Sequence, residues 1–588
     1  MRARWLAGIL AAAAAIATPA WPQSRADRAL EPAIAAYERL DRQRDPISAG
    51  FEGDREAQRR WPDPRPEAAA ARHVELQAIA ARLERIDARR LSPDAALNHA
   101  LLRRLTREQI EAHAFDLDRI PFENDSGFHT TPDYVARSTV IRTREDADAW
   151  MARLEALPAY IDAHIANARR GVETGFTQPE VVVVRVIATA RVYAGQSAQE
   201  SALLRPFATT QSGLDAAALA AYRARAEALY ARAIQPAFQR FAAFLEQDYL
   251  PAARPALAWR TLPGGADSYR FLVRQHTTTD MTPDAIHALG QAEVARIRGQ
   301  MDAIIAEIGF SGDFDAFLAH LRSDPRFYAR TPEELLEKAS EIAKRADDQL
   351  PQLFATLPRL PYGVRPVPAE IAEGYTTGRY FPGSPQLGLA GGYMVNTSRL
   401  DQRALYELPA LTLHEAVPGH HLQIALAQEL TGAPYFRRQL GVTAFVEGWG
   451  LYAESLGEDM GIYRTPYERF GRLSYEMWRA CRLVADTGLH WLGWSLAEAR
   501  RCFDENSALS PHNITTELER YVSWPGQALA YKIGELRLQG LRRDAQTRLG
   551  ERFDIRAFHD VVLGAGALPL DVLEGRVRAW MDAQAAAP

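Results

Sequence analysis

The sequence predicts a mainly α-helical protein, large and multi-helical, with two lobes and one short β edge. Apolar residues recur at intervals of three and four positions through most of the chain, which is the period of an amphipathic helix. A length of 588 residues exceeds what one hydrophobic core usually serves, so two or more lobes are expected. Between residues 358 and 397 the composition shifts to proline, glycine and tyrosine, which predicts loops and short strands.

Residues 1–20 have the pattern of a secretory signal peptide. Two arginines precede an apolar run that ends in small residues at Thr18 and Ala20. This run is too short to span a membrane comfortably, and no other long uncharged run follows. We therefore expect cleavage after Ala20 and a periplasmic or secreted protein without stable membrane insertion. The absence of a cysteine near that position argues against a lipid anchor.

Composition argues against a nucleic-acid partner and leaves open whether the two cysteines form a disulfide. A formal net charge of -5 disfavours nucleic acid, because phosphate binding needs a basic face. The only two cysteines, Cys481 and Cys502, could pair in an oxidising compartment or remain free thiols. The sequence gives no indication of the oligomeric state.

Residues 21–357 are predicted to form an N-terminal helical region. Thr282 and Pro283 begin one of its helices, with a hydroxyl cap followed by proline in the first turn. We interpret the histidines of this region as structural, since their spacing matches no pattern of metal ligands. The expected helices are Glu67–Ile86, Pro93–Leu105, Asp146–Arg170, Ala216–Gln247, Pro283–Ile308 and Pro332–Leu357.

Residues 358–588 are predicted to form a zinc-binding catalytic region around the stretch L-T-L-H-E-A-V-P-G-H-H-L-Q, residues 411–423. His414 stands directly before Glu415, and His420 and His421 follow six and seven residues after His414. Neutral imidazoles can hold Zn²⁺, and a neighbouring carboxylate can take a proton from the water that the metal activates. The pattern therefore predicts a site for one zinc ion with Glu415 as general base.

The stretch departs from the usual H-E-x-x-H motif, in which both histidines share one helix face. Pro418 stands where the second histidine would be, and its ring clashes with the carbonyl of residue 414 in a regular helix. Gly419 tolerates the backbone angles of a break. We expect the helix to bulge or restart here. A regular helix would favour His421 by direction, whereas a bulge favours His420, which we prefer as the ligand with His421 close by.

Glu447, in F-V-E-G-W-G-L-Y-A-E, is the candidate third ligand. Catalytic zinc sites commonly use three protein ligands and keep one position open. The aromatic residues around Glu447 indicate a buried environment, where carboxylates are usually paired or bound to metal. An ordinary exposed glutamate on an amphipathic helix is the alternative, and Glu454 is the next candidate ligand.

Together these two motifs resemble the bacterial DUF885 family, which is similar to the gluzincin metallopeptidases of the thermolysin-like clan. The likeness extends through most of the mature chain, including Tyr269–Gly290 and Tyr521–Gly534. It implies a mainly helical, zinc-peptidase-like fold and a zinc-dependent hydrolase, without naming a substrate. A mostly helical chain of this length also resembles the deep-channel oligopeptidases, which favours short peptides. In gluzincin-like enzymes an edge strand before the metal helix holds extended substrate, which makes Tyr393 and Asn396 candidate substrate-binding residues.

Weaker candidates follow Glu447. His490 lies among apolar residues and is either catalytic or a core histidine. Arg520 and Lys532 could bind a substrate carboxylate. Tyr521 or Tyr531 could donate a hydrogen bond to the oxyanion of a tetrahedral intermediate, or simply pack with a local partner for its hydroxyl.

The sequence thus predicts an exported zinc hydrolase, a peptidase acting on short peptides. Glu415 would take a proton from the zinc-activated water and return it to the leaving amine. One alternative is a zinc hydrolase or lyase with a non-peptide substrate and the same residues. Another is a non-catalytic periplasmic binding protein with a structural metal, for which a closed four-ligand shell would be expected.

Overall fold

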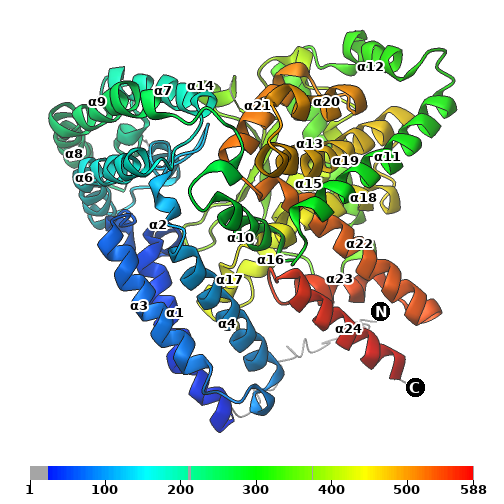
Figure 1. The fold of residues 1–588 in the computed structure, drawn as a ribbon, viewed down its shortest axis with the longest axis horizontal. Coiled ribbons are helices and arrows are strands. Elements are labelled where there is room, and N and C mark those ends of the chain that lie inside the picture. The colour runs from blue at the N-terminus through cyan, green and yellow to red at the C-terminus, as the bar shows by residue number, and fades with distance from the viewer. Residues whose placement is uncertain (1–23, 209–212, 374, 587–588) are drawn as a thin grey trace, which may run out of the picture.

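The computed structural model of the protein describes residues 24–208, 213–373 and 375–586, and it confirms a mainly helical fold with a small sheet (Figure 1). The predicted signal peptide, residues 1–20, lies outside the described residues. Within the described ranges, none of the helices combines the length and the apolar composition that crossing a membrane requires.

The first helices form an elongated arm and an adjoining bundle, on the left in Figure 1. In the arm α1 and α4 pack on α3, and in the bundle α7 packs on α9. The predicted helix 216–247 is interrupted by a π-helical turn at Tyr230–Ile234, just before Pro236, whose missing N–H removes a backbone hydrogen bond. The helices are α1 (Arg25–Arg44), α2 (Pro46–Phe51), α3 (Pro66–Leu83), α4 (Pro93–His113), α5 (Thr131–Ser138), α6 (Arg144–Thr174), α7 (Glu180–Gly195), α8 (Ala216–Leu229) and α9 (Gln235–Phe244).

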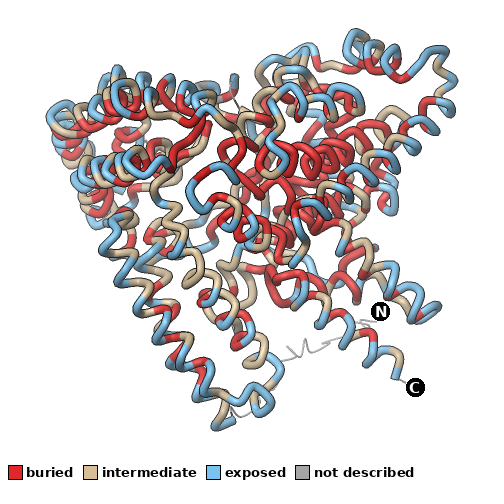
Figure 2. Tube along the Cα trace, in the orientation of Figure 1, coloured by how far each residue is buried: buried red, intermediate tan, exposed pale blue. Residues whose placement is uncertain are grey.

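The remaining helices surround the most deeply buried part of the chain. Figure 2 shows buried positions gathered where α15, α18 and α19 lie in Figure 1. The helices are α10 (Gly265–Thr277), α11 (Pro283–Ile308), α12 (Phe314–Ser323), α13 (Pro332–Leu353), α14 (Ala369–Ala372), α15 (Leu408–Glu415), α16 (His420–Gln428), α17 (Tyr435–Arg438), α18 (Thr443–Asp459), α19 (Pro466–Thr487), α20 (Leu496–Asn506), α21 (Pro511–Ser523), α22 (Ala530–Leu549), α23 (Ile555–Leu563) and α24 (Leu570–Ala586).

Two close helix pairs hold this part together. The helix α11 packs along α19, and α18 packs along α22. A Cβ atom on Gly448 would lie 2.5 Å from the Cα of Gly534, so the backbones of α18 and α22 approach more closely than any side chain would allow. This contact brings Tyr531, near the start of α22, beside the helix that carries Glu447.

The small sheet corrects one prediction. Its order is β1 (Tyr362–Pro366), β3 (Gly391–Val395), β2 (Gly378–Phe381), with β1 parallel and β2 antiparallel to β3. The edge strand that we expected before the metal helix, at Tyr393, is β3, which is the central strand and is paired on both sides. Among the described strands, β2 pairs only with β3, so β2 is an edge strand. This strand faces α15, the helix that ends at Glu415.

A disulfide resolves the cysteine question. Cys481 of α19 and Cys502 of α20 are joined with an S–S distance of 2.01 Å. The Cys481 side chain is fully buried. The bridge therefore fastens α20 to the helix that runs through the centre of this part of the chain.

Lys532 is a structural residue and not the substrate ligand that we expected. Its Nζ lies 2.8 Å from Glu476, 2.9 Å from Glu535 and 3.1 Å from Glu293, and the side chain is 0% exposed. Burial disfavours the ammonium, but the three carboxylates outweigh it and raise the pKa of Lys532 above its usual value. The charge thus ties α22 to α11 and α19, and no part of it is left for a substrate.

Lys532→Met should lower the free energy of unfolding by about 3–5 kcal/mol, because it leaves buried carboxylates without their partner. Urea unfolding measures this loss. The control is Lys338→Met, whose exposed ammonium lies 3.9 Å from Glu334 and should contribute within about 0.5 kcal/mol. If the two variants were equally stable and only Lys532→Met lost substrate affinity, Lys532 would be a substrate ligand, as the sequence predicts.

Candidate metal centre

The predicted break in the metal helix is present. The helix α15 ends at Glu415 and α16 begins at His420, with residues 416–419 between them. A Cβ on Gly419 would lie 1.9 Å from the carbonyl oxygen of His414, so only glycine fits this turn. Trp449 of α18 donates its indole N–H to the carbonyl of Pro418 at 2.8 Å. As a result the rings of His414 and His420 lie side by side, with centroids 4.6 Å apart.

His414, His420 and Glu447 form a group that fits a metal ion. Glu447 Oε2 lies 3.5 Å from Nε2 of His414 and 3.4 Å from Nε2 of His420. One ligand atom from each of the three residues lies within 4.8 Å of the other two. Tetrahedral ligands at zinc distances are separated from one another by about 3.3–3.5 Å. The group therefore leaves a space of the right size for Zn²⁺, and the prediction of His420 over His421 matches this grouping.

The hydrogen bonds of the three residues also fit a cation. His414 Nδ1 donates to Glu454 Oε1 at 2.8 Å, which leaves Nε2 as an acceptor facing the Glu447 carboxylate. Glu447 Oε2 is buried and receives no hydrogen bond from any described residue. Burial disfavours the charged form of Glu447, but His420 and His414 hold its pKa well below its usual range. Acceptor atoms that converge without a donor need a positive charge between them.

The electrostatics of His414 lead to the same conclusion. Burial lowers the pKa of its ring, but the neighbouring carboxylates of Glu447 and Glu454 outweigh burial and raise the pKa to about 9. Without a metal, the cluster thus takes up a proton near neutral pH. A metal ion that binds here would replace this proton.

Glu454 orients His414, a role that the sequence analysis did not assign. It was considered only as a substitute ligand, but its carboxylate bonds the side of the ring that points away from Glu447. Arg479 of α19, also buried, lies 3.0 Å from the same oxygen. Carboxylates that hold the second nitrogen of a metal-binding histidine fix its tautomer and direction. The pattern that could have shown this is the seven-residue spacing of Glu447 and Glu454, which places both on one helix face.

Gly450 lies on that same face, between the two glutamates. A Cβ on this residue would lie 2.6 Å from His414 Cε1 and 2.8 Å from Nε2. The imidazole therefore rests directly on the bare backbone of α18. No larger residue than glycine lets the ring reach both carboxylates.

Glu415 is held beside the centre by the sheet. Its Oε2 accepts a hydrogen bond of 2.7 Å from the backbone N–H of Tyr380 in β2, and Oε1 receives none from the described residues. The carboxylate is buried. One oxygen is thus fixed by the edge strand, while the other remains able to accept a proton.

His421, named with His420 as a candidate ligand, turns away from this group. Its Nδ1 is hydrogen bonded to the Tyr380 hydroxyl at 2.9 Å, and its ring packs on Tyr362 with centroids 4.6 Å apart. Burial lowers its pKa to about 4, so it is neutral at physiological pH. The structure therefore places His421 among the residues that position β2.

Of the two candidate tyrosines, only Tyr531 reaches the centre. Its ring lies nearly parallel to that of His414, with centroids 6.5 Å apart, and the Arg482 guanidinium is 4.1 Å from its centroid. Tyr521 is 1% exposed; its hydroxyl donates to Glu517 at 2.7 Å and accepts from Arg482 at 2.8 Å. The Tyr521 hydroxyl is thus committed to holding Arg482 and is not free for an oxyanion.

His490 and Arg520 are likewise engaged within the protein. His490 Nε2 donates to the carbonyl of Tyr521 at 2.8 Å, and burial lowers its pKa to about 3, which identifies a neutral core histidine. Arg520 lies 3.0 Å from Glu517 and donates to Gln527 at 2.8 Å, so its charge is already paired.

Tyr393 and Asn396 do not face the metal centre. The Tyr393 hydroxyl is 3.1 Å from that of Thr412, and the ring is fully buried. Asn396 Nδ2 donates to the carbonyls of residues 372, 375 and 376 and holds the turn that precedes β2. Both are structural: Tyr393 belongs to the central strand, and Asn396 follows its end and holds a turn.

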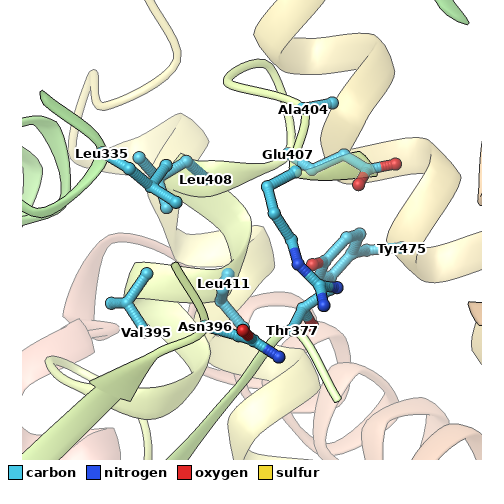
Figure 3. Close-up of a pocket in the computed structure, with 10 residues that line it drawn as sticks. Leu335, Thr377, Val395, Asn396, Ala404, Glu407, Leu408, Leu411 and Tyr475 are labelled. Atoms are coloured by element: carbon cyan, nitrogen blue, oxygen red, sulfur yellow. The ribbon is translucent and has the colours of Figure 1, made fainter. Parts of the chain in front are cut away.

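Asn396 instead lines a small cavity of about 20 Å³ between the end of β3 and α15 (Figure 3). The volume suits one water molecule. Glu407 and Arg403, which also line it, each have a buried polar atom without a partner among the described residues. Burial raises the pKa of Glu407 to about 7. The cavity is a place for a buried water and contains none of the metal-centre residues.

The comparisons with known proteins support the fold and give no activity. The family described as "Bacterial protein of unknown function (DUF885)" matches residues 46–577. Among curated proteins, none matches the chain significantly. A crystal structure from Colwellia psychrerythraea, described as a candidate lipoprotein, is similar with 27% identity and a TM-score of 0.89, covering 96% of this chain and 100% of that one. A candidate lipoprotein of unknown function from Shewanella oneidensis, with 17% identity, a TM-score of 0.69 and coverage of 94% and 99%, shares the fold.

His420→Ala should lower zinc affinity by more than about 100-fold. Losing a residue that only hydrogen bonds to a ligand already lowers metal affinity by about 10–100-fold, and losing a ligand itself should cost more. His421→Ala should change it by less than about 10-fold. Competition with a chelating dye measures both. A large loss confined to His421→Ala would reverse the assignment, and little loss in either variant would reject the centre.

Gly450→Ala should lower zinc affinity by about 10–100-fold, since the added methyl group displaces the His414 ring from Glu454. The control is Gly299→Ala in α11, where no atom lies within 4 Å of the added Cβ. That change should leave zinc affinity unaltered and raise the free energy of unfolding by about 0.4–1 kcal/mol. Unchanged zinc affinity in Gly450→Ala would show that the ring has room to move.

Proposed function

The chain belongs to the DUF885 family of bacterial proteins of unknown function, and we propose from its site that it is a zinc-dependent hydrolase acting on short peptides. One observation carries this proposal. A buried histidine, His414, is oriented by Glu454 through one ring nitrogen and presents the other to Glu447 and His420, while Glu415 stands in the next position of the chain.

The ligand set favours catalysis over a structural role. The grouped ligands are His414, His420 and Glu447, and His421 is bonded to Tyr380 instead. Structural zinc sites have closed shells of four protein ligands, whereas catalytic sites keep one position open. This observation weighs against the non-catalytic binding protein. These three residues would hold Zn²⁺, which when bound would supply Lewis-acid chemistry toward a carbonyl and lower the pKa of water.

The chain's own residues provide the proton transfers. Glu415 is fixed by the Tyr380 N–H through one oxygen, so its other oxygen can accept a proton from water and return it to the leaving amine. Tyr531 can donate its hydroxyl proton in a hydrogen bond to the oxyanion that develops on the substrate. Its ring packs between His414 and Arg482, which limits its motion.

A peptide is favoured over other acyl substrates by the edge strand. The Tyr380 N–H points away from β3 toward Glu415, so the free side of β2 runs beside the catalytic base. Main-chain groups along such an edge can hold an extended peptide. A zinc hydrolase or lyase with a non-peptide substrate would use the same residues and remains the second candidate.

We place this activity outside the cytoplasm. The buried Cys481–Cys502 bridge is typical of an oxidising compartment. Both similar solved structures are described as candidate lipoproteins, a class of exported proteins. The signal-peptide pattern of residues 1–20 supports the same location.

Glu415→Gln should retain zinc but lose hydrolysis by about a thousandfold or more, because an amide keeps the shape of the carboxylate and cannot act as a base. Digestion of a peptide library followed by mass spectrometry measures activity, and elemental analysis measures zinc. Glu458→Gln, at an exposed position of α18, is the control and should keep both. Near-normal turnover by zinc-loaded Glu415→Gln would remove Glu415 from the mechanism, and a wild-type protein that cleaves no peptide would favour the non-peptide candidate.

A further inference from the structure

Arg379 of β2 is an exposed cation next to the catalytic base. It directly precedes Tyr380, whose N–H is 2.7 Å from Glu415. Side chains alternate along a strand, so Tyr380 points to His421 while Arg379 points to the opposite face. On that face Arg379 is exposed to solvent.

The surroundings of Arg379 connect it to the metal centre. Its guanidinium lies 5.3 Å from the centroid of the Tyr375 ring. The Asp125 carboxylate and the side chains of Tyr375 and Tyr531 lie in its neighbourhood, and the Tyr531 ring is stacked on His414. Arg379 therefore lies near Tyr531 and is exposed to solvent, one residue from the strand position that holds Glu415.

In contrast to the other arginines near the centre, Arg379 has no acidic partner among the described residues. Arg479 is bound to Glu454, and Arg482 and Arg520 are both bound to Glu517. Arg379 makes no hydrogen bond or ion pair with any of the described residues. A free guanidinium offers a planar pair of donors that matches a carboxylate.

We propose that Arg379 binds the C-terminal carboxylate of the substrate, so that the enzyme removes one or two residues from the C-terminus of short peptides. This inference rests on the proposed peptidase function. An extended peptide advances about 3.3–3.6 Å per residue. The backbone of Arg379 is one residue from Tyr380, whose N–H is hydrogen bonded to Glu415. A carboxylate bound by its side chain thus belongs to a residue one or two positions beyond the cleaved bond.

Two acidic residues lie near Arg379. Glu123 and Asp125 lie close enough to influence each other, and Arg379 and Arg520 act on Glu123. Burial raises the pKa of Glu123 to about 7, so it carries only part of a negative charge near neutral pH. Asp125 is exposed and does not form an ion pair with Arg379. The guanidinium of Arg379 is therefore available to a substrate carboxylate.

The test compares peptides of one sequence that end in a free carboxylate or in an amide. For the wild-type protein we expect kcat/KM for the free acid to exceed that for the amide by about 10–100-fold, the range for a hydrogen bond to a charged group. In Arg379→Gln this ratio should fall to about 1, and Arg379→Lys should keep part of it. Arg365→Gln is the matched control, since Arg365 is exposed on β1 of the same sheet and pairs with no described residue.

A binding measurement separates this inference from the proposed function. In zinc-loaded Glu415→Gln, the free acid should bind more tightly than the amide by a similar factor, and adding Arg379→Gln should abolish the difference. Equal cleavage of acid and amide by the wild type, or cleavage mainly at internal bonds, would overturn the C-terminal anchor while leaving a peptidase. An equal loss for both peptides in Arg379→Gln would assign it a structural role. Absence of both binding and cleavage would overturn the peptidase function as well.

Discussion

The contact on which the centre depends is that of the His414 ring with the backbone of α18. The ring lies over Gly450 and reaches Glu454 with one nitrogen and Glu447 with the other. Both carboxylates come from a single rigid helix, so their spacing is set by the helix and not by loop positions. The position of His414 therefore determines where the third ligand and the base must come from. His420 enters through the turn at residues 416–419, and Glu415 points to the sheet.

Holding three carboxylates and two histidines in the protein interior requires compensating charge. Glu454 is balanced by Arg479, while Glu447 depends on the two histidines and on the cation that the group could hold. Ionised groups pay a large desolvation cost when they are buried, and removing one partner costs more than the pair contributes. The neighbouring pairs of Arg482 with Glu517 and of Lys532 with Glu476 follow the same rule. This network explains why so many of the basic residues near the centre are unavailable to a substrate.

The sequence was sufficient for features that depend on local chemistry. Helical periodicity identified most of the elements, and Pro418 with Gly419 identified the break that places His420. Features that depend on distant pairing were not accessible. Whether residues 391–395 form an edge depends on β1 and β2, which lie on both sides of β3 only after folding. Lys532 was predicted to bind a substrate carboxylate, but the three carboxylates that it contacts are contributed by different parts of the chain. Tyr521 and Tyr531 share a motif, and only the packing of α22 against α18 distinguishes their environments.

In the proposed function, the edge strand β2 would link catalysis to recognition through its strand geometry. One of its residues donates its N–H to Glu415, and the residue before it projects a cation, unpaired among the described residues, on the opposite face. Neighbouring residues of a strand are separated by a fixed rise of about 3.3 Å. If the cation binds the end of the substrate, the distance from that end to the cleaved bond is then set by the strand itself. A cation on a flexible loop would not impose such a distance. In the proposed function, the short strand β2 would thus provide a physical reason for cleavage close to the C-terminus.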